Sequence, residues 1–290
     1  MPKIETLERD IALLLTEEKG VVLPADVFAK FGTEVAMAMS RQLEKASGPS
    51  REAGIIRASE VGAIDTCPRK FWYMLNTPEA GEGFNYNTCI KFMYGDIIEE
   101  VVLTLAKAAG HDVQMEQASF EKDLRWRGWK IKGHIDAVID GVLVDVKSTT
   151  SYGMKDFLAG RGGLKFGYRA QLNVYADMAG IADKGWIPVD KQSGKLAYVP
   201  EYATYDVASL YADAERIIAT AKVETLSPRL DTVTDGGNKK LSTECSYCQF
   251  KKTCWADANG GKGLRAFAYS TGPVYFTEVK KEPRVPEIKL

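Results

Sequence analysis

Apolar residues recur at helical spacing along several stretches of the chain, and stretches of apolar–polar alternation lie between them. Spacings of three and four residues predict amphipathic helices, whereas alternation predicts strands. Helices are predicted over 5–17, 24–46, 88–109, 166–180 and 206–223, and strands over 112–121, 129–139, 142–148, 185–189 and 196–205. A short helix, a Cys-Pro turn and another helix are predicted within 58–76. This order indicates an α/β (α+β) fold with a central mixed β-sheet flanked by helices.

Composition divides the chain into three predicted regions. The polar segment KASGPSREAG, residues 45–54, separates an N-terminal helical segment (1–57) from a core (58–256) that ends in a cysteine cluster. A C-terminal tail, 257–290, is rich in charge and proline. No Walker-type glycine-rich loop occurs, so the chain carries no recognisable ATP-driven motor.

The stretch GHIDAVIDGVLVDVKS, residues 133–148, predicts a β-hairpin. Asp140-Gly141 lies between two apolar runs, and such a pair favours a two-residue turn in which both residues have positive φ. Six apolar side chains then share one face and pair across it: Ile139 with Val142, Ala137 with Val144, and Ile135 with Val146. This face is expected to pack on a core.

The other face of the predicted hairpin is charged. Asp136 is predicted to lie directly opposite Asp145, and His134 opposite Lys147. Directly opposed like charges destabilise a sheet, so two facing carboxylates need a reason, and a hard divalent cation supplies one. Lys147 could orient an attacking water or neutralise charge on a phosphate. The alternative is a solvent-facing polar side on which Lys147 only neutralises the acids, and Asp-x-Lys taken alone favours that alternative.

Length, hydropathy and charge limit the class of protein, but they do not identify its function. The 290 residues are 45% hydrophobic, enough for a packed core in one large or two small domains. No stretch approaches the ~20 apolar residues of a membrane span, and no signal-peptide core begins the chain, so a cytoplasmic location without a membrane partner is expected. The formal net charge of −1 means that a polyanion would have to be held by local basic patches.

Five cysteines are present, and three of them form the pattern C-x₂-C-x₅-C at Cys245, Cys248 and Cys254. Cytosolic disulfides are rare, so this spacing favours metal or redox chemistry. Cys67, in the Cys-Pro turn, is the better fourth partner, because Cys89 lies within a helical pattern and is expected to be a buried apolar residue. Four thiolates can hold structural zinc or an iron–sulfur cluster, and unliganded cysteines are the remaining alternative.

Gln171 and Tyr175 complete the set of candidate residues. They are four residues apart in the helix predicted over 166–180, so they share one helix face and can present an amide and a phenol beside the hairpin. A Gln-x-x-x-Tyr pattern alone is a weak signal.

Together these motifs resemble the PD-(D/E)XK nuclease superfamily, in its RecB-like branch. The shared order is an acid in one strand, Asp-x-Lys in the next strand, and Gln-x-x-x-Tyr in a following helix. With the distal cysteine and C-x₂-C-x₅-C, the arrangement is similar to iron–sulfur nucleases of the AddB type and to the CRISPR-associated exonucleases related to them. The resemblance covers about residues 58–256 and implies a restriction-endonuclease-like core there.

The resemblance implies roles for individual residues. It implies a 4Fe-4S cluster on Cys67, Cys245, Cys248 and Cys254, metal ligation by Asp136, Asp145 and the carbonyl of Val146, and catalytic roles for Asp136, Asp145, Lys147, Gln171 and Tyr175. The family's helical G-x-x-x-H-E stretch corresponds here to GDIIEE, residues 95–100. Glu99 occupies the histidine position and is expected to bind Mg²⁺ or Mn²⁺, with Glu100 as the nearby alternative.

The leading hypothesis is therefore a metal-dependent DNA exonuclease with a structural cluster. It would act on single-stranded DNA or DNA ends in recombination, repair, or phage- or CRISPR-related processing, in the cytoplasm of a bacterium or of a virus's host. No helicase is fused, so a separate helicase or recombination protein is the expected protein partner. Two alternatives remain: a non-catalytic nucleic-acid-binding adaptor subunit, motivated by the missing motif histidine, and a zinc-stapled domain with no nucleic-acid role.

Overall fold

The computed structural model describes residues 2–17, 22–46, 52–83, 86–126, 128–164, 167–226 and 228–290. The chain forms two compact units, each built from segments distant in sequence. Unit 1 comprises Met1–Asp65 and Asn85–Glu215, and unit 2 comprises Thr66–Phe84 and Arg216–Leu290. None of the described helices is long and apolar enough to cross a membrane.

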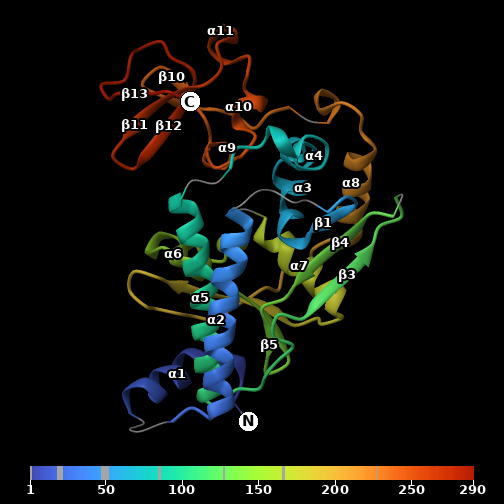
Figure 1. The fold of residues 1–290 in the computed structure, drawn as a ribbon, viewed down its shortest axis with the longest axis vertical. Helices are drawn as coiled ribbons and strands as arrows, with labels where there is room; N and C mark the ends of the chain where they lie inside the picture. The colour runs from blue at the N-terminus through green and yellow to red at the C-terminus, as the bar shows by residue number, and fades with distance from the viewer. Residues whose placement is uncertain are drawn as a thin grey trace. The chain divides into compact units, whose positions relative to one another are not determined.

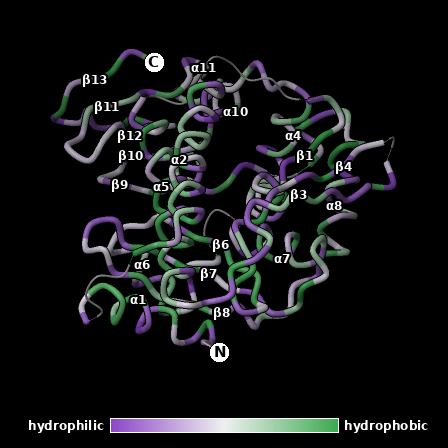
Figure 2. The backbone as a smooth tube through the Cα atoms, turned by 60° about the horizontal axis from the view of Figure 1, so that its bottom comes forward, coloured by the Kyte–Doolittle hydropathy of each residue, from purple (hydrophilic) through white to green (hydrophobic). Residues whose placement is uncertain are grey.

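The centre of unit 1 is a five-stranded mixed sheet. Its strand order is β2-β5-β6-β7-β8, with β6 and β7 parallel and the other neighbours antiparallel. The strands are β2 (Val113–Gln114), β5 (Ala137–Ile139), β6 (Val142–Thr149), β7 (Lys184–Asp190) and β8 (Val199–Pro200). Four of the eight residues of the central strand β6 are valine or leucine, and they form green stretches of the tube in Figure 2.

Helices cover both faces of this sheet. On one face the apolar core joins the N-terminal helices to α5, with Ile4, Leu7, Ile11, Val102 and Leu103 packed on Val144, Val146 and Ile187. The N-terminal elements are η1 (Ile4–Thr6) and α1 (Leu7–Thr16), and α5 is Tyr86–Ala108. The other face carries α6 (Ser151–Leu158) and α7 (Tyr168–Ala179), whose aromatic rings meet those of the strands, as Phe157 meets Trp186 with ring centroids 5.9 Å apart.

The remaining elements of unit 1 extend this layered core. Helix α2 (Ala25–Ala46) runs beside α5 (Figure 1). A second, three-stranded sheet has the order β1-β4-β3, with β1 (Ile55–Arg57), β4 (Lys130–His134) and β3 (Ser119–Asp123). Short helices η2 (Ala58–Glu60) and α3 (Gly62–Thr66) follow β1, η4 is Gly162–Leu164, and α8 is Val207–Ala219. The mixed sheets and flanking helices confirm the predicted fold class.

The predicted hairpin turn is confirmed, but the strand before it is shorter than predicted. Asp140 and Gly141 have φ of 52° and 85°, and Ile139 pairs with Val142 and Ala137 with Val144. The single strand predicted over 129–139 is instead two strands in different sheets, β4 and β5. The ladder therefore ends at Ala137, and the predicted pairing of Ile135 with Val146 is absent from the β5–β6 register.

Because of the break between β4 and β5, His134 and Asp136 do not lie at their predicted positions. His134 pairs with Ser119 of β3, so the predicted placement opposite Lys147 is wrong. Asp136 lies beyond the end of the β5–β6 ladder, so it does not face Asp145 as a cross-strand pair. Its side chain instead accepts a hydrogen bond from the backbone of Val146, with 2.7 Å between Val146 N and Asp136 Oδ2.

Unit 2 joins a short helical segment to the C-terminal region. Its helices are α4 (Pro68–Asn76), η3 (Pro78–Ala80), η5 (Val223–Thr225), α9 (Thr243–Ser246), α10 (Lys251–Cys254) and α11 (Ala258–Gly261). Its sheet has the order β13-β11-β12-β10-β9, with β9 (Val233–Asp235), β10 (Asn238–Lys240), β11 (Arg265–Tyr269), β12 (Gly272–Glu278) and β13 (Glu287–Ile288). Segment 257–290, expected as a tail, thus contributes three strands to an antiparallel sheet.

Candidate active site

Three acidic side chains and one lysine come together in unit 1. Asp145 and Lys147 project from the same side of β6, Asp136 precedes β5, and Glu99 projects from α5. Asp145 is buried, with 2% exposure, whereas Glu99 and Asp136 are half-buried. Asp136, Asp145 and Glu99 are close enough for their charges to interact. The site thus concentrates negative charge at a place partly screened from water.

Removal from water and mutual repulsion both disfavour the charged forms of these acids. Burial, followed by the charge of Asp145, raises the pKa of Asp136 to about 7. Burial, followed by the charge of Asp136, raises the pKa of Glu99 well above its ordinary value. Burial also raises the pKa of Asp145, although Lys147 opposes that shift. A cation at this place would therefore relieve repulsion among carboxylates.

Lys147 is held beside Asp145 by contacts on two sides. Its Nζ donates a hydrogen bond to Asp145 Oδ1 at 2.9 Å and lies 2.7 Å from Oδ2. The same Nζ lies 4.7 Å from the centre of the Tyr168 ring, within range of a cation–π interaction. Burial alone would lower the pKa of Lys147, but Asp145 and Asp136 raise it above its ordinary value. Lys147 therefore enters the site as a fixed positive charge.

The predicted pair on α7 is also part of this site. Gln171 Nε2 donates to Tyr175 Oη at 3.3 Å, as their spacing of four residues predicts. Burial raises the pKa of the Tyr175 phenol, and the charges of Asp145 and Asp136 add to that shift. Strand β4 approaches the ring closely, since a Cβ on Gly133 would lie 2.7 Å from Tyr175 Cε1. The phenol therefore has little room to move.

The structure separates the two neighbouring glutamates of α5. Glu99 interacts with Asp136 and Asp145, whereas Glu100 is influenced mainly by Glu34 and Glu116 after burial. Glu99 is thus the glutamate placed at the acidic site, as its position in the motif led us to expect. Val146, whose carbonyl was expected as a metal ligand, is 9% exposed in the middle of β6.

Two contributors to the site have no motif that would have singled them out. Gln117, in the loop between β2 and β3, donates a hydrogen bond from Nε2 to Glu99 Oε1. Tyr168, at the first position of α7, lies over Lys147. For Tyr168 a signal was available, since it stands three residues before Gln171 and so shares its helix face. Gln117 lies in an irregular loop, where periodicity gives no signal.

The acidic site supplies the oxygen donors that Mg²⁺ and Mn²⁺ prefer, but its three carboxylates make hydrogen bonds within the protein. Carboxylate oxygens suit these hard cations, and Asp145 Oδ2 is buried without a hydrogen bond of its own, although the Lys147 ammonium lies near it. Across the described ranges, no group of three or more His, Cys, Asp or Glu side chains is arranged to hold a metal ion. Within the site, Asp136, Asp145 and Glu99 accept hydrogen bonds from Val146, Lys147 and Gln117, respectively.

Four of the five cysteines gather in unit 2. Cys67 precedes α4, and its thiolate interacts electrostatically with Cys254. Cys245 interacts with Cys67 and Cys254, and Cys248 with Cys67 and Cys245. Burial raises the pKa of Cys67 and of Cys245, and raises that of Cys248 to about 11. Cys89 belongs to α5 in unit 1 and is half-buried, so it is not the fully buried residue that was expected.

This thiol set has the composition that zinc or an iron–sulfur cluster needs. The five cysteines are free thiols, and the four in unit 2 are half-buried beside apolar side chains such as Phe250 and Leu241. Among the residues described, these cysteines are not arranged as a preformed metal-binding group. Proximity and donor type therefore fit a bound metal centre, while ligating geometry is not present.

Comparisons with known proteins bear on the acidic site and the fold. A profile described as the PD-(D/E)XK nuclease superfamily matches residues 91–255, more than half of the chain. The matched range includes Glu99, Asp136, Asp145, Lys147, Gln171, Tyr175 and the last three cysteines, but it leaves out Cys67. No curated protein is similar enough in sequence to count as a match.

Solved structures resemble the chain at low sequence identity. The structure of SSO0001 is 18% identical, covers 74% of this chain and 93% of that chain, and has a TM-score of 0.48. LHK-Exo in complex with dAMP is 13% identical, with coverage of 63% and 91% and a TM-score of 0.42. The alkaline exonuclease LHK-Exo from Laribacter hongkongensis is 11% identical, with coverage of 62% and 91% and a TM-score of 0.38.

Proposed function

Because the chain belongs to the PD-(D/E)XK nuclease superfamily, we propose that it is a metal-dependent DNA exonuclease that hydrolyses phosphodiester bonds. The observation that carries the proposal is that Glu99, Asp136 and Asp145 lie close enough for their charges to interact, with Lys147 paired to Asp145. Such a combination concentrates ligands for a divalent cation beside a fixed positive charge. A purely structural polar cluster would have no need for three mutually repelling acids.

In this proposal Mg²⁺ or Mn²⁺ is held by the side chains of Glu99, Asp136 and Asp145 and by the carbonyl of Val146. When bound, such an ion polarises a phosphoryl oxygen and lowers the pKa of water. The protein's own contribution is to keep the acids together in a half-buried place, where their charges act strongly. Gln117 keeps the Glu99 carboxylate directed into the site through its hydrogen bond.

Lys147 has two tasks in this mechanism. Its ammonium remains charged, because Asp145 and Asp136 raise its pKa, and so it can stabilise negative charge that develops on the phosphate. It can also orient the attacking water by donating a hydrogen bond. The Tyr168 ring on one side and Asp145 on the other restrict its movement. In this proposal Gln171 and the Tyr175 phenol, which are hydrogen-bonded to each other, position the substrate.

We further propose that Cys67, Cys245, Cys248 and Cys254 hold a structural 4Fe-4S cluster. Their mutual proximity supports this, together with their partial burial. Such a cluster would link the segment that begins at Thr66 to the C-terminal part of unit 2. A cytoplasmic location agrees with free thiols. Zinc is the competing occupant, and colour separates the two, since a zinc protein is colourless.

The proposed substrate is single-stranded DNA or a DNA end, and the proposed setting is recombination, repair, or phage- or CRISPR-related DNA processing. A separate helicase or recombination protein would supply the ends. These assignments follow the resemblance of the motifs in the sequence.

The test uses anaerobically purified protein with Mn²⁺ and two substrates, end-labelled linear single-stranded DNA and covalently closed circles. We expect shortening of the linear DNA alone, and loss of that activity in Lys147→Ala. Lys184→Ala is the matched control, because Lys184 begins the neighbouring strand β7 and lies opposite Leu143, away from Lys147. Cutting of circles would show that the enzyme is an endonuclease and not an exonuclease. DNA binding without any cleavage would favour the hypothesis of a non-catalytic adaptor subunit.

A further inference from the structure

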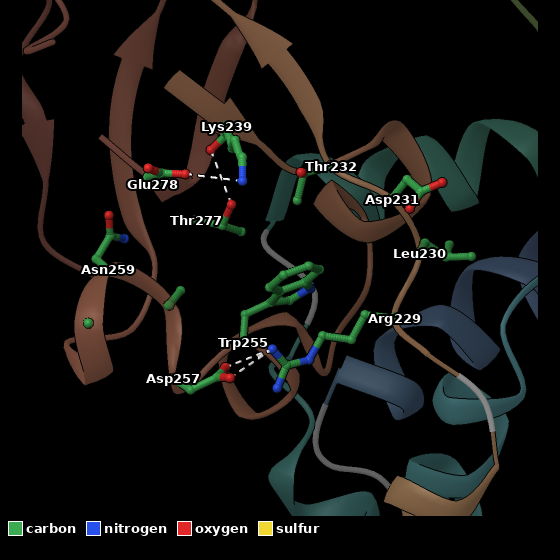
Figure 3. Close-up of a pocket in the computed structure, with 12 residues that line it drawn as sticks. Arg229, Leu230, Asp231, Thr232, Lys239, Trp255, Asp257, Asn259, Thr277 and Glu278 are labelled. Atoms are coloured by element: carbon green, nitrogen blue, oxygen red, sulfur yellow. Dashed lines mark hydrogen bonds and ion pairs between the residues drawn. The ribbon is translucent and has the colours of Figure 1, made fainter. Parts of the chain in front are cut away.

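A pocket of about 680 Å³ lies in unit 2, outside the acidic site (Figure 3). Its size is within the range of small-molecule binding sites. The walls come from the segment around Arg229, from β10 and β12, and from residues 255–260, which follow the cysteine cluster. All of the lining residues belong to unit 2, so the pocket is complete within one compact part of the chain. The proposed nuclease mechanism uses none of them.

The indole of Trp255 stands in the middle of the pocket (Figure 3). It is held in place, because it packs against the buried residues Leu241, Ala258 and Leu264. The Arg229 guanidinium lies 4.8 Å from the ring centre and pairs with Asp257 at 2.7 Å. Across the hollow lie Lys239, Thr277 and Glu278. Trp255 is therefore a fixed, partly exposed aromatic surface.

The charges of the lining favour a nucleobase over a phosphate group. Two cationic residues, Arg229 and Lys239, stand against three acids, Asp231, Asp257 and Glu278. A phosphate inside the pocket would meet this surplus of negative charge. A neutral base would find an aromatic ring to stack on, and carboxylate, hydroxyl and amide groups for hydrogen bonds to its edge.

Outside the pocket, the unit as a whole has an excess of positively charged residues. Unit 2 contains fifteen lysine and arginine residues against ten aspartate and glutamate residues, whereas the whole chain has a net charge of −1. Positive charge that follows the phosphate backbone, combined with an aromatic ring for bases, is the usual combination in proteins that bind single strands. A base paired within a duplex could not enter the pocket without leaving its stack.

We propose that the Trp255 pocket binds one unpaired base of a single-stranded nucleic acid, while basic side chains of unit 2 hold the neighbouring phosphates. The inference rests on the proposed function in one respect, since DNA is the expected substrate, but it assigns a binding site separate from the acidic residues.

The test measures binding in buffer with EDTA, so that cleavage does not interfere. Full-length protein is titrated into a fluorescein-labelled single-stranded oligodeoxynucleotide of mixed sequence, and anisotropy gives the Kd. We expect Trp255→Ala to weaken binding by about tenfold, within the range that stacking of one base contributes, and Trp255→Phe to keep most of the affinity. Tyr202→Ala is the control, because this tyrosine of unit 1 is 87% exposed.

Folding is checked by thermal melting of each variant. If Trp255→Ala does not fold, Thr232→Glu carries the test, because it adds a fourth carboxylate to the pocket without removing the packed indole; weaker binding is again expected. Equal affinity of the wild type and the folded pocket variants would overturn the proposal, as would tight binding of free nucleotides with none of the oligonucleotide. Cleavage with Mn²⁺ is measured on the same preparations, so failure of the nuclease proposal is seen separately.

Discussion

Gln117 is the residue whose backbone most clearly departs from common geometry near the acidic site. It has a φ of 53°, as does Met115 two residues earlier, and residues other than glycine rarely adopt this conformation. The backbone N–H of Gln117 donates to Asp136 O at 3.1 Å, and its side chain donates to Glu99. One strained loop residue thus contacts two of the three segments that bring acids into the site, α5 and the segment before β5.

Gln117→Ala should therefore weaken metal-dependent cleavage without unfolding the protein. Loss of a hydrogen bond that orients a metal ligand commonly costs about 10–100-fold in metal affinity or activity, so we expect at least a tenfold higher Mn²⁺ concentration for half-maximal cleavage. The measurement is cleavage rate against Mn²⁺ concentration. Gln114→Ala is the control, since the Gln114 amide donates to Asp112, which is not one of the acids of the site. An unchanged Mn²⁺ requirement would show that Gln117 does not position Glu99.

Asp190, at the end of β7, gives a prediction about stability and pH. Hydrogen bonds from Ser151 and Ser193, each at 2.7 Å, and from the Gln192 N–H lower its pKa to about 2. The unfolded value is about 3.9. Because the folded state favours the carboxylate, this contribution to stability is complete above the unfolded pKa and is lost as pH falls from about 4 to about 2.

Asp190→Asn should be less stable than the wild type at neutral pH, and the gap between them should narrow as pH falls through this window. Urea unfolding at a series of pH values measures it. A gap that stays constant from pH about 6 to about 3 would contradict the assigned hydrogen bonds. Asp183→Asn serves as the control, since it changes a carboxylate that lies just before the opposite end of β7.

At the scale of elements, the hairpin turn and the helices could be predicted well from the sequence, because their signals are local. The Asp-Gly turn and the helices over 7–16, 25–46, 86–108 and 168–179 depend on nearby residues alone. The break at residues 135–136 could not be predicted, because alternation continues across it while the two halves pair with different strands. The C-terminal sheet was missed for a similar reason: its strands are short, and some of them pair with partners distant in the sequence.

Two glycines in helical segments should respond to substitution in opposite ways. Gly62 of α3 lies against Gly167, which begins α7 in a left-handed conformation, and a Cβ on Gly62 would lie 2.5 Å from Gly167 Cα. Gly62→Ala should therefore destabilise the protein by about 1–3 kcal/mol, as overpacking usually does, and displace the α7 residues Gln171 and Tyr175. Both the melting temperature and the cleavage rate should fall.

Gly32 of α2 is the matched comparison, since nothing lies within 4 Å of the place that a Cβ on this residue would occupy. Alanine there should stabilise the helix by up to about 1 kcal/mol and leave cleavage unchanged. The difference in sign between the two substitutions is the critical result. If Gly62→Ala melted at or above the wild-type temperature, the close approach of α3 and α7 would be incorrect.

On the scale of the whole molecule, each compact unit is discontinuous in sequence. The segment Thr66–Phe84 joins the C-terminal region through contacts such as the stacked rings of Tyr73 and Phe250, 5.5 Å apart, and the ion pair of Glu82 with Lys251 at 2.6 Å. The cysteine motif indicated that Cys67 would join this region, whereas no pattern in the sequence indicated that a five-stranded sheet would form there. Domain boundaries at 57 and 256 remain predictions.

This connectivity makes the cysteines the natural place to test how unit 2 is held together. Cross-linking residues distant in sequence stabilises a fold by reducing the freedom of the unfolded chain, and a cluster shared by Cys67 and Cys254 would close a long loop in this way. Without a bound metal, burial favours the neutral thiols, as the raised pKa of Cys67 and Cys248 indicates. Metal binding must therefore displace protons, and it should become weaker as pH falls.

Cys67→Ser should lose the metal centre and lower the melting temperature of the anaerobically purified protein, whereas Cys89→Ser should keep both. Cys89 is the matched control, because it is a half-buried cysteine of unit 1, apart from the four thiols of unit 2. Metal analysis and the visible spectrum measure occupancy. Iron in a brown protein would support a 4Fe-4S cluster, whereas zinc in a colourless protein would show that the thiols bind zinc instead. Wild-type protein that holds neither metal would leave the four thiols as a packed cluster, and their substitution should then change stability no more than substitution of Cys89.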